Sequence, residues 1–380
     1  MLIYVAMFAL SSIFLYLSRR VKGKKFRKLC VIIALLLPSL LAAFRATSIG
    51  TDYGVYGTTF FNFAKNSSGL LDYFATMSSM GYTDYGCCTL IYLSSLVSDE
   101  YILEMFLFQI ITVVFIYLGL CKCEERYGTP VWLAMLLYYF AQYNSSLNVM
   151  RQSIAVALAF YAFTCIWEKK YVKYVIFMLL AFTMHSSTLL AVALLILYKF
   201  LQGASARTEK KQIIRGMVIV VLIAGVSMGL SNIVDLLVNI GVISGNFASY
   251  LSGGLYSYSS IGGAISLPKL ANQTIYMVAF ALYYRNMNRK QMDALFFTMD
   301  SLLVFIIYVF SPFFAKYVYR MAYYFVPLQM VGLSNIALLN KKESRKIWNV
   351  LIIFVAFAFW FILTVWYGEN ATVPYEFYWS

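Results

Sequence analysis

Four cationic side chains lie at the ends of apolar segments, apart from the clusters that hold most of the other basic residues. They are Arg45, Arg151, Lys316 and Arg320. Arginine and lysine bind phosphate and pyrophosphate oxygens through charge-assisted hydrogen bonds, and they stabilise negative charge without a metal ion. These four residues are therefore candidates for an anion-binding site.

Arg151 follows a polar run that contains Asn144 and Asn148, and it begins a long apolar segment. A helix that starts there adds unpaired backbone N–H groups to the guanidinium, and both favour an anion. Lys316 and Arg320 are four positions apart and share one helix face, so a polyanion between them would relieve their repulsion. The alternative is that these cations only anchor helices at a membrane surface, together with nearby tyrosines.

Two further side chains could handle protons. His185, the single histidine, lies in a short polar turn between apolar segments, and Asp52 follows Arg45 by seven positions, after the turn-forming Gly50. Either could act as a general base. The alternatives are that His185 only caps a helix and that Asp52 only pairs with Arg45. One histidine without neighbouring cysteine or carboxylate does not form a tight metal site, so no metal ligands are expected.

The segments between these residues are typical of an integral membrane protein. Hydrophobic residues make up 62% of the 380 residues and charged residues only 12%. The apolar runs are continuous rather than alternating, which predicts transmembrane helices. The net charge of +14 comes from basic residues at helix ends, where they meet anionic head groups, and it does not indicate nucleic-acid binding. Twelve spans are expected, near residues 2–18, 28–44, 101–121, 130–147, 151–167, 172–184, 187–202, 213–231, 271–284, 294–311, 318–339 and 347–367.

The distribution of charge orients these spans. Twenty-four of the 30 lysines and arginines fall in six short connecting segments, which the positive-inside rule places in the cytoplasm, with both termini outside. For the basic segments to alternate in this way, Tyr85–Val97 must not cross the membrane. A helix of that length is also too short for a bilayer core of ~30 Å. We therefore expect a re-entrant or interfacial helix there; a tilted thirteenth span is the alternative. The six basic segments are 19–28, 122–126, 168–173, 199–215, 285–290 and 341–346.

Two long segments remain on the outer side, at residues 45–100 and about 232–270. The second is rich in glycine and serine, which predicts a mobile lid. No soluble catalytic domain is expected. The chain is predicted to be one all-α, polytopic membrane domain over residues 1–380, a pattern compatible with a GT-C-like architecture. Any chemistry must then be built from helix ends and these two loops.

Four motifs follow one another along the chain. They are Phe44–Tyr53, Asn148–Gln152, His185–Ser187 and Tyr319–Arg320. In their order and spacing they resemble the EpsG family of Wzy-type polysaccharide polymerases, over most of the chain, although no single motif is highly specific. One departure is visible: many relatives carry an acidic residue followed by proline and glycine after the first loop, and the corresponding Thr83–Gly86 lacks the proline. This departure leaves the role of Asp84 open.

The resemblance implies a reaction and a location. Such enzymes join oligosaccharide repeat units carried on undecaprenyl pyrophosphate, at the outer face of the bacterial cytoplasmic membrane. The growing chain leaves its lipid pyrophosphate and attaches to a sugar hydroxyl of the next unit, and the product is a capsule, an exopolysaccharide or an O-antigen. The implied partners are the lipid-linked oligosaccharide, the bilayer, and a flippase and a chain-length regulator of the same pathway. No cofactor and no metal are implied.

The candidate residues can be matched to this chemistry. The role of stabilising negative charge on the leaving pyrophosphate is assigned first to Arg151 and Arg320, and second to Lys316 and Arg45. His185 and Asp52 are the candidate bases, with a slight preference for His185 because its turn lies at the outer end of the helix that follows Arg151. The expected substrate contacts are Tyr53, Asp84, Asn148, Gln152 and Tyr319.

Three other functions remain open at this stage. A glycosyltransferase that uses a single lipid-linked sugar would also need an acidic residue in the first loop, often with a metal. A transporter or flippase of lipid-linked oligosaccharides would place cations along a central path, whereas here they gather at one face. An acyltransferase would hold its histidine deep in the bilayer or on the side of the acyl donor.

Overall fold

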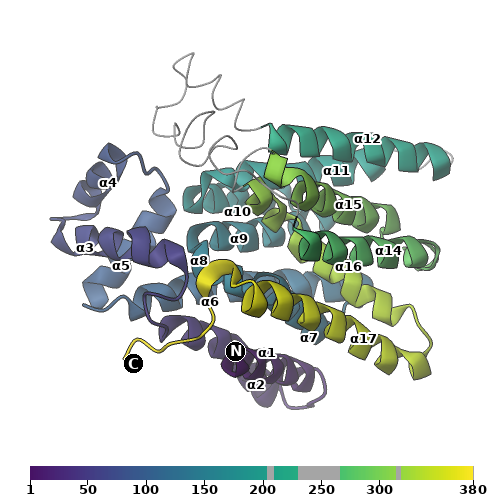
Figure 1. The fold of residues 1–380 in the computed structure, drawn as a ribbon, viewed down its shortest axis with the longest axis horizontal. Coiled ribbons are helices and arrows are strands. Elements are labelled where there is room, and N and C mark those ends of the chain that lie inside the picture. Colours follow the sequence, from purple (N-terminus) through teal and green to yellow (C-terminus); the bar gives the residue numbers. More distant parts are fainter. Residues whose placement is uncertain (203–208, 230–265, 314–317, 380) are drawn as a thin grey trace. The chain divides into compact units, whose positions relative to one another are not determined.

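The computed structural model of the protein describes residues 1–202, 209–229, 266–313 and 318–379 (Figure 1). Within these residues the secondary structure is helical, apart from an isolated β-bridge between Arg45 and Phe377. The chain forms two compact units, one made of residues 1–188 and 342–380 and the other of residues 189–341. The expected all-α class is confirmed.

A buried central helix organises the first unit. Helix α9 packs against both α6 and α10, and 83% of its 18 residues are buried. Close packing with α6 depends on Gly119, where an added Cβ would lie 2.4 Å from the ring of Phe160. Small residues allow helices in a membrane to approach in this way. The principal helices of this unit are α1 (Leu2–Ser18), α2 (Lys24–Ala43), α6 (Ile102–Tyr127), α7 (Val131–Tyr138), α8 (Asn144–Asn148), α9 (Met150–Trp167), α10 (Tyr171–Met184) and α17 (Lys342–Trp360).

The polar run before Arg151 breaks a helix, as its composition predicts. Helix α7 continues through a π-helical turn at Tyr139–Tyr143 into the short α8, and the chain leaves helical geometry at Val149 before α9 begins. Buried polar groups require hydrogen-bond partners, especially in a membrane protein. Two such hydrogen bonds involve this break: Tyr143 donates to the carbonyl of Pro38, and the side-chain oxygen of Asn144 accepts from Trp360.

The first long loop is itself folded. It contains a π-helical turn at Tyr53–Gly57, followed by α3 (Thr58–Asn66), α4 (Leu70–Ser79) and α5 (Tyr85–Val97). These three helices lie side by side, and α5 also packs against α6 and α10 (Figure 1). The bounds of α5 are those expected for the short helix, and its re-entrant placement stays a prediction.

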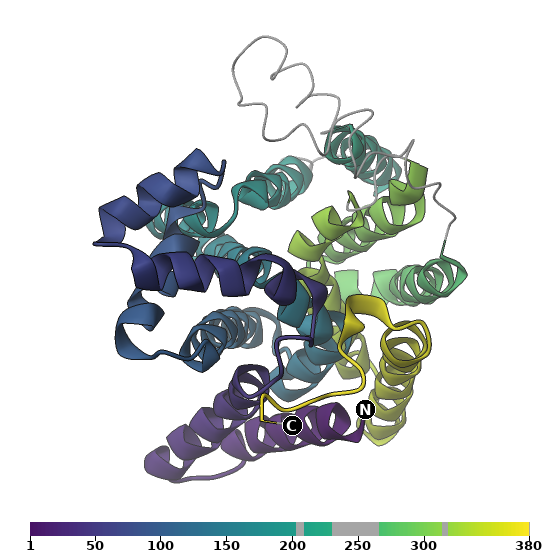
Figure 2. The same cartoon turned by 60° about the vertical axis from the view of Figure 1, so that its left-hand side comes forward.

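The segment after α17 returns to the beginning of the chain. A π-helical turn at Phe361–Trp366 and a short turn at Glu369–Ala371 lead into an extended tail. Figure 2 shows this tail, in yellow, passing beside the end of α2, in purple. Backbone hydrogen bonds from Ala46 to Glu376 and from Tyr378 to Phe44 hold it there.

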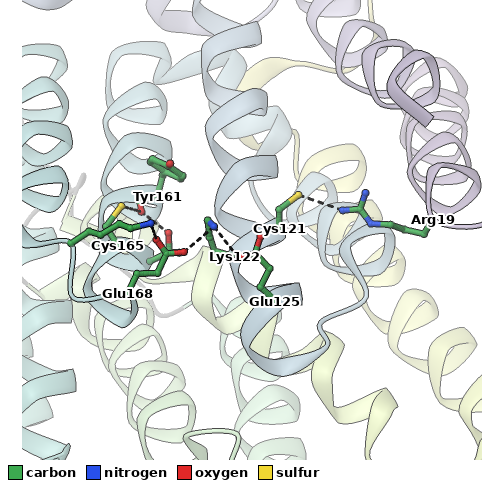
Figure 3. Close-up of polar contacts among 9 residues, drawn as sticks. Arg19, Cys121, Lys122, Glu125, Tyr161, Cys165 and Glu168 are labelled. Carbon is green, nitrogen blue, oxygen red and sulfur yellow. Dashed lines mark hydrogen bonds and ion pairs between the residues drawn. The ribbon is translucent and has the colours of Figure 1, made fainter. Parts of the chain in front are cut away.

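One end of α6 and α9 carries a network of ion pairs (Figure 3). Arg19, after α1, pairs with Glu124 at 2.7 Å, and Lys122 pairs with Glu168 at 2.8 Å. Glu168 in turn pairs with Lys170 at 2.6 Å. Three basic segments that the charge rule assigns to one side of the membrane therefore lie together. Arg151 lies at the opposite end of α9, which at 18 residues is about 27 Å long.

The second unit packs α15 against α11, α12, α14 and α16. Gln329 donates hydrogen bonds to Gln273 and Ser301 in its buried core. A helical turn at Val318–Tyr324 meets α16 at an angle of 54°. The helices are α11 (Val192–Gln202), α12 (Glu209–Met228), α14 (Leu267–Arg289), α15 (Ala294–Phe310) and α16 (Val326–Leu338).

Five helices of the described residues are long and apolar enough to cross a membrane, and the bent pair would make a sixth. The other expected spans are also helical: α12 and α14, at 20 and 23 residues, are of similar length but are not among these five, and the rest are shorter. The number twelve and a GT-C-like arrangement therefore stay predictions. The glycine- and serine-rich segment at 232–270 falls mainly outside the described residues. The long apolar helices support a membrane protein.

Candidate functional site

Arg151, on the first turn of α9, forms a largely buried ion pair with Asp84. The Nη1 atom of Arg151 lies 2.7 Å from Oδ2 of Asp84, and the two side chains are 17% and 14% exposed. Asp84 directly precedes α5 and reaches this place because α5 packs against α10. Gly86 permits the close approach, since an added Cβ would lie 2.3 Å from Oγ1 of Thr183. Although Tyr85 stands between them in place of a proline, Asp84 and Gly86 thus both take part in this contact.

Asp84 also connects α9 to the turn that carries the histidine. Its carboxylate accepts a hydrogen bond from the backbone N–H of Ser186, next to His185. Burial raises the pKa of Asp84 above the usual aspartate value, while Arg151 and the Ser186 N–H act in the opposite direction. The Asp84 carboxylate therefore links the start of α5, the start of α9 and the turn after α10. Its raised pKa means that it binds a proton more readily than an exposed aspartate does.

An aromatic ring covers part of the Arg151 guanidinium. The centroid of the Tyr82 ring lies 5.6 Å from Cζ of Arg151, and Tyr82 itself packs edge-on against Phe60 of α3. A cation over an aromatic face gains about 0.5–2 kcal/mol, depending on its exposure to water. The folded first loop therefore contributes both an anion and a ring to the placement of Arg151.

His185 is held in one ring orientation by Ser187. Its Nδ1 accepts a hydrogen bond from the backbone N–H of Ser187 at 3.2 Å and lies 2.8 Å from the Ser187 hydroxyl. A backbone N–H can only donate, so Nδ1 is unprotonated and the neutral ring carries its proton on Nε2. In this arrangement Nε2 is a hydrogen-bond donor.

The turn that carries Asp52 is fixed to α8 by Asn148. The side-chain oxygen of Asn148 accepts hydrogen bonds from the Asp52 backbone N–H at 2.9 Å and from the Thr51 hydroxyl at 3.1 Å. Gly50 has a φ of +83°, and an added Cβ there would lie 2.8 Å from the carbonyl oxygen of Leu147. Only glycine fits a left-handed position this close to another backbone. The first loop is therefore attached to α8, just before the helix break that precedes Arg151.

Arg45, expected to bind an anion at the surface, lies in the interior. Its side chain is 1% exposed, its Nη2 donates to the sulfur of Met150 at 3.1 Å, and its Nε forms no hydrogen bond with a described residue. It does not pair with Asp52. Burial lowers the pKa of Arg45, but the usual value for arginine is so high that the guanidinium remains charged. The tyrosines whose hydroxyls interact electrostatically with it are Tyr4, Tyr53, Tyr143 and Tyr375.

Two expected substrate contacts are also buried. Tyr53 is fully buried and donates to Glu104 at 2.9 Å, and burial raises the pKa of Tyr53, which keeps its hydroxyl protonated. Gln152 is 5% exposed within α9. Sequence reasoning missed Glu104, although an acidic residue at the start of an apolar run is itself a signal. It also missed residues 369–379, whose contacts with distant segments leave no local pattern.

Arg320 and Tyr319 lie in the second unit, on the turn before α16. The Nζ of Lys269 lies 4.5 Å from the centroid of the Tyr319 ring and 5.8 Å from that of Tyr308. Lys269, one of two lysines that belong neither to the six basic segments nor to the four candidate cations, thus lies over the ring of Tyr319. Lys65, the other such residue, forms an exposed ion pair with Asp99 at 2.9 Å. Lys316 lies outside the described residues.

The comparison with known families reaches nearly the whole chain. The sequence profile of the EpsG family matches residues 28–377. The chain belongs to the EpsG family. All the site residues named above, from Arg45 to Arg320, fall inside the matched range of this EpsG protein. Neither the search of curated proteins nor that of solved structures gave a match. Membership in the EpsG family supports a glycosyltransferase-like role in making a polysaccharide.

The ion pair between Asp84 and Arg151 gives a first test. Replacing Asp84 with Asn leaves a largely buried guanidinium without its carboxylate, which is expected to cost about 3 kcal/mol of stability, as for other broken buried pairs. The matched control is Asp99→Asn, which breaks the exposed pair with Lys65 and should cost less than about 1 kcal/mol. Thermal unfolding of the purified protein in detergent measures both. Equal shifts in Tm for the two variants would show that the Asp84 contact is not structural.

Proposed function

We propose that this EpsG-family protein is a polysaccharide polymerase that acts on oligosaccharide repeat units linked to undecaprenyl pyrophosphate. The hydroxyl oxygen of the acceptor unit forms a bond to the anomeric carbon of the donor chain, and the hydroxyl proton passes to a base. The bond between that carbon and the pyrophosphate oxygen breaks, and the lipid pyrophosphate leaves with the electron pair. The enzyme must therefore stabilise negative charge on the leaving group and accept one proton.

The observation that best supports this proposal is the junction of Arg151, Asp84 and Ser186. It brings the second motif, the acidic residue of the first loop and the histidine turn to the beginning of one helix. A guanidinium beside the first N–H groups of α9 is suited to the pyrophosphate of the donor. Arg320 and Lys316 are proposed as further ligands of the anion, and Arg45 as a ligand that becomes available only after the tyrosines around it move.

The hydrogen bonds of His185 alter the preferred base. Its Nε2–H is suited to donate to a phosphate or sugar oxygen, whereas Nδ1 is occupied by Ser187. Asp52 carries a carboxylate at the end of a turn that Asn148 holds in place. We therefore assign the base to Asp52 and assign to His185 the role of a hydrogen-bond donor, reversing the slight preference for His185 that the sequence alone favoured.

The two ends of α9 support the membrane arrangement that we propose. The network of Lys122, Glu168 and Lys170 lies at one end, and Arg151 begins the other. With the basic segments in the cytoplasm, the site lies at the extracytoplasmic face of the bacterial inner membrane. The polar break before Arg151 would let the polyprenyl tail remain in lipid while its pyrophosphate meets the cations.

An assay with purified protein and lipid-linked repeat units tests the proposed reaction. The wild type should give a ladder of polymer lengths that is insensitive to chelator, because arginines replace the metal. Arg151→Ala and Arg320→Ala should each reduce the rate about 100-fold or more, as when other groups that stabilise transition-state charge are removed. Lys65→Ala is the matched control and should behave as the wild type.

Several outcomes of that assay would contradict the proposal. Normal long polymer from both arginine variants would exclude these roles. Transfer of one sugar only, dependent on a divalent metal, would favour a glycosyltransferase with a single-sugar donor. Movement of intact lipid-linked units across a vesicle membrane, without new glycosidic bonds, would favour a flippase.

The roles of Asp52 and His185 can be separated with isosteric variants. Glutamine retains an N–H donor near the place of the histidine Nε2, so His185→Gln should keep a measurable part of kcat, and His185→Ala should lose it. Asp52→Asn, which cannot accept the proton, should lose activity across the pH range. If His185 were the base, Gln and Ala would be equally inactive, and Asp52→Asn would keep the pH profile of the wild type.

The orientation of the chain is tested by cysteine labelling in a background without the native cysteines. Leu71, 80% exposed on α4, should react as Leu71→Cys with an impermeant maleimide added outside intact spheroplasts. Lys170→Cys, in the basic network, should react only after the membrane is permeabilised. The reverse pattern would place the first loop in the cytoplasm and overturn the assigned face.

A further inference from the structure

Residues 369–379, here called the strap, are not part of any motif in the sequence, yet they bind the first loop at three points. Backbone hydrogen bonds run from Ala46 to Glu376 at 2.9 Å, from Tyr378 to Phe44 at 3.0 Å and from Gly50 to Ala371 at 3.0 Å. Figure 2 shows the strap along this loop. The segment between α2 and Asp52 is therefore held at both of its ends.

Thr372 lies in the first half of the strap and is fully buried. Its hydroxyl oxygen accepts a hydrogen bond from Nδ2 of Asn144 at 2.8 Å, and its carbonyl accepts one from the Tyr4 hydroxyl at 2.8 Å. The other side of the Asn144 amide is also fixed, because Trp360 donates to its oxygen at 2.8 Å. The amide has a single orientation that satisfies both partners.

Asn144 acts on the site through one turn of helix. It is four residues before Asn148 in α8, so the two side chains lie on the same face. Asn148 in turn accepts the hydrogen bond from the Asp52 backbone. The strap also contacts the neighbouring residue, since Asn370 donates to Ser145 at 3.3 Å. A chain of direct contacts thus runs from Thr372 through α8 to the turn of Asp52.

We propose that Thr372 is a positioning residue for the site, and that its hydroxyl fixes α8 and, through Asn148, the place of the Asp52 carboxylate. This inference rests on the proposed function of Asp52. The hydroxyl is specifically required, because an apolar group of the same shape leaves the buried N–H of Asn144 without an acceptor. A displacement of α8 by a fraction of an ångström moves the base relative to the acceptor hydroxyl, and catalytic rates are sensitive to such shifts.

The test compares Thr372→Val with Thr372→Ser in the polymerisation assay. Thr372→Val, nearly isosteric, should reduce kcat about tenfold or more with little change in KM for the lipid-linked donor, because the pyrophosphate ligands are untouched. Thr372→Ser keeps the acceptor oxygen and should restore kcat. Thr364→Val is the matched control: Thr364 is also buried, near the end of α17, and takes no part in the contacts just described.

A double variant examines the proposed route. If Thr372 acts through Asn144, Thr372→Val should have no further effect on kcat in an Asn144→Leu background. Additive losses would overturn the route through Asn144. A loss of folded protein in Thr372→Val, with kcat per folded molecule unchanged, would show that the strap is only structural.

A readout without catalysis separates this inference from the proposed function. Asp52→Cys should react with an impermeant maleimide at a rate that Thr372→Val changes severalfold and Thr364→Val does not. If Thr372→Val changes the labelling rate but the protein that retains Asp52 makes no polymer, the positioning role stands and the polymerase function is rejected. An unchanged rate together with normal polymerisation would reject the positioning role alone.

Discussion

A charge inside a membrane protein needs a partner, because its transfer from water to a medium of low dielectric is costly. The pair formed by Arg151 and Asp84 meets this requirement, and the arrangement of the first unit depends on it. The pair brings the start of α5 to the start of α9, and the Ser186 N–H adds the end of α10. A loop that would otherwise extend from the membrane is thereby folded against the central helix.

Arg45 shows a second way to hold a cation in the interior. Its guanidinium is surrounded by tyrosines and contacts the sulfur of Met150 rather than a carboxylate. Glu104 is also buried, but Tyr53 takes its hydrogen bond. The Nε of Arg45 forms no hydrogen bond with a described residue, and the Met150 that Arg45 contacts directly precedes Arg151 in α9. Arg45 is therefore closed off from the surface, whereas Arg151 is accessible in part.

The sequence predicts the helical class and several of the helices, but not the contacts between them. Continuous apolar runs and polar interruptions predict α5 with its observed bounds and the break before Arg151, because both depend on local composition. The partner of Arg151 could not be predicted, since Asp84 lies 67 positions away and no local pattern connects the two. The same limit applies to Lys269 beside Tyr319 and to the strap. The tautomer of His185 depends on a single backbone N–H, which only coordinates reveal.

The strap has a consequence for biosynthesis. Ribosomes make a chain from its N-terminus, and membrane helices insert as they emerge. The first loop and α9 are made early, but Thr372 and the residues that bind Phe44, Ala46 and Gly50 are translated about two hundred residues after α9 and more than three hundred after Gly50. Until these residues are made, the segment that leads to Asp52 lacks its hydrogen bonds to Ala371 and Glu376. A nascent chain therefore lacks these hydrogen bonds until residues 369–379 have left the ribosome, and the segment around Asp52 reaches its observed arrangement only after that step.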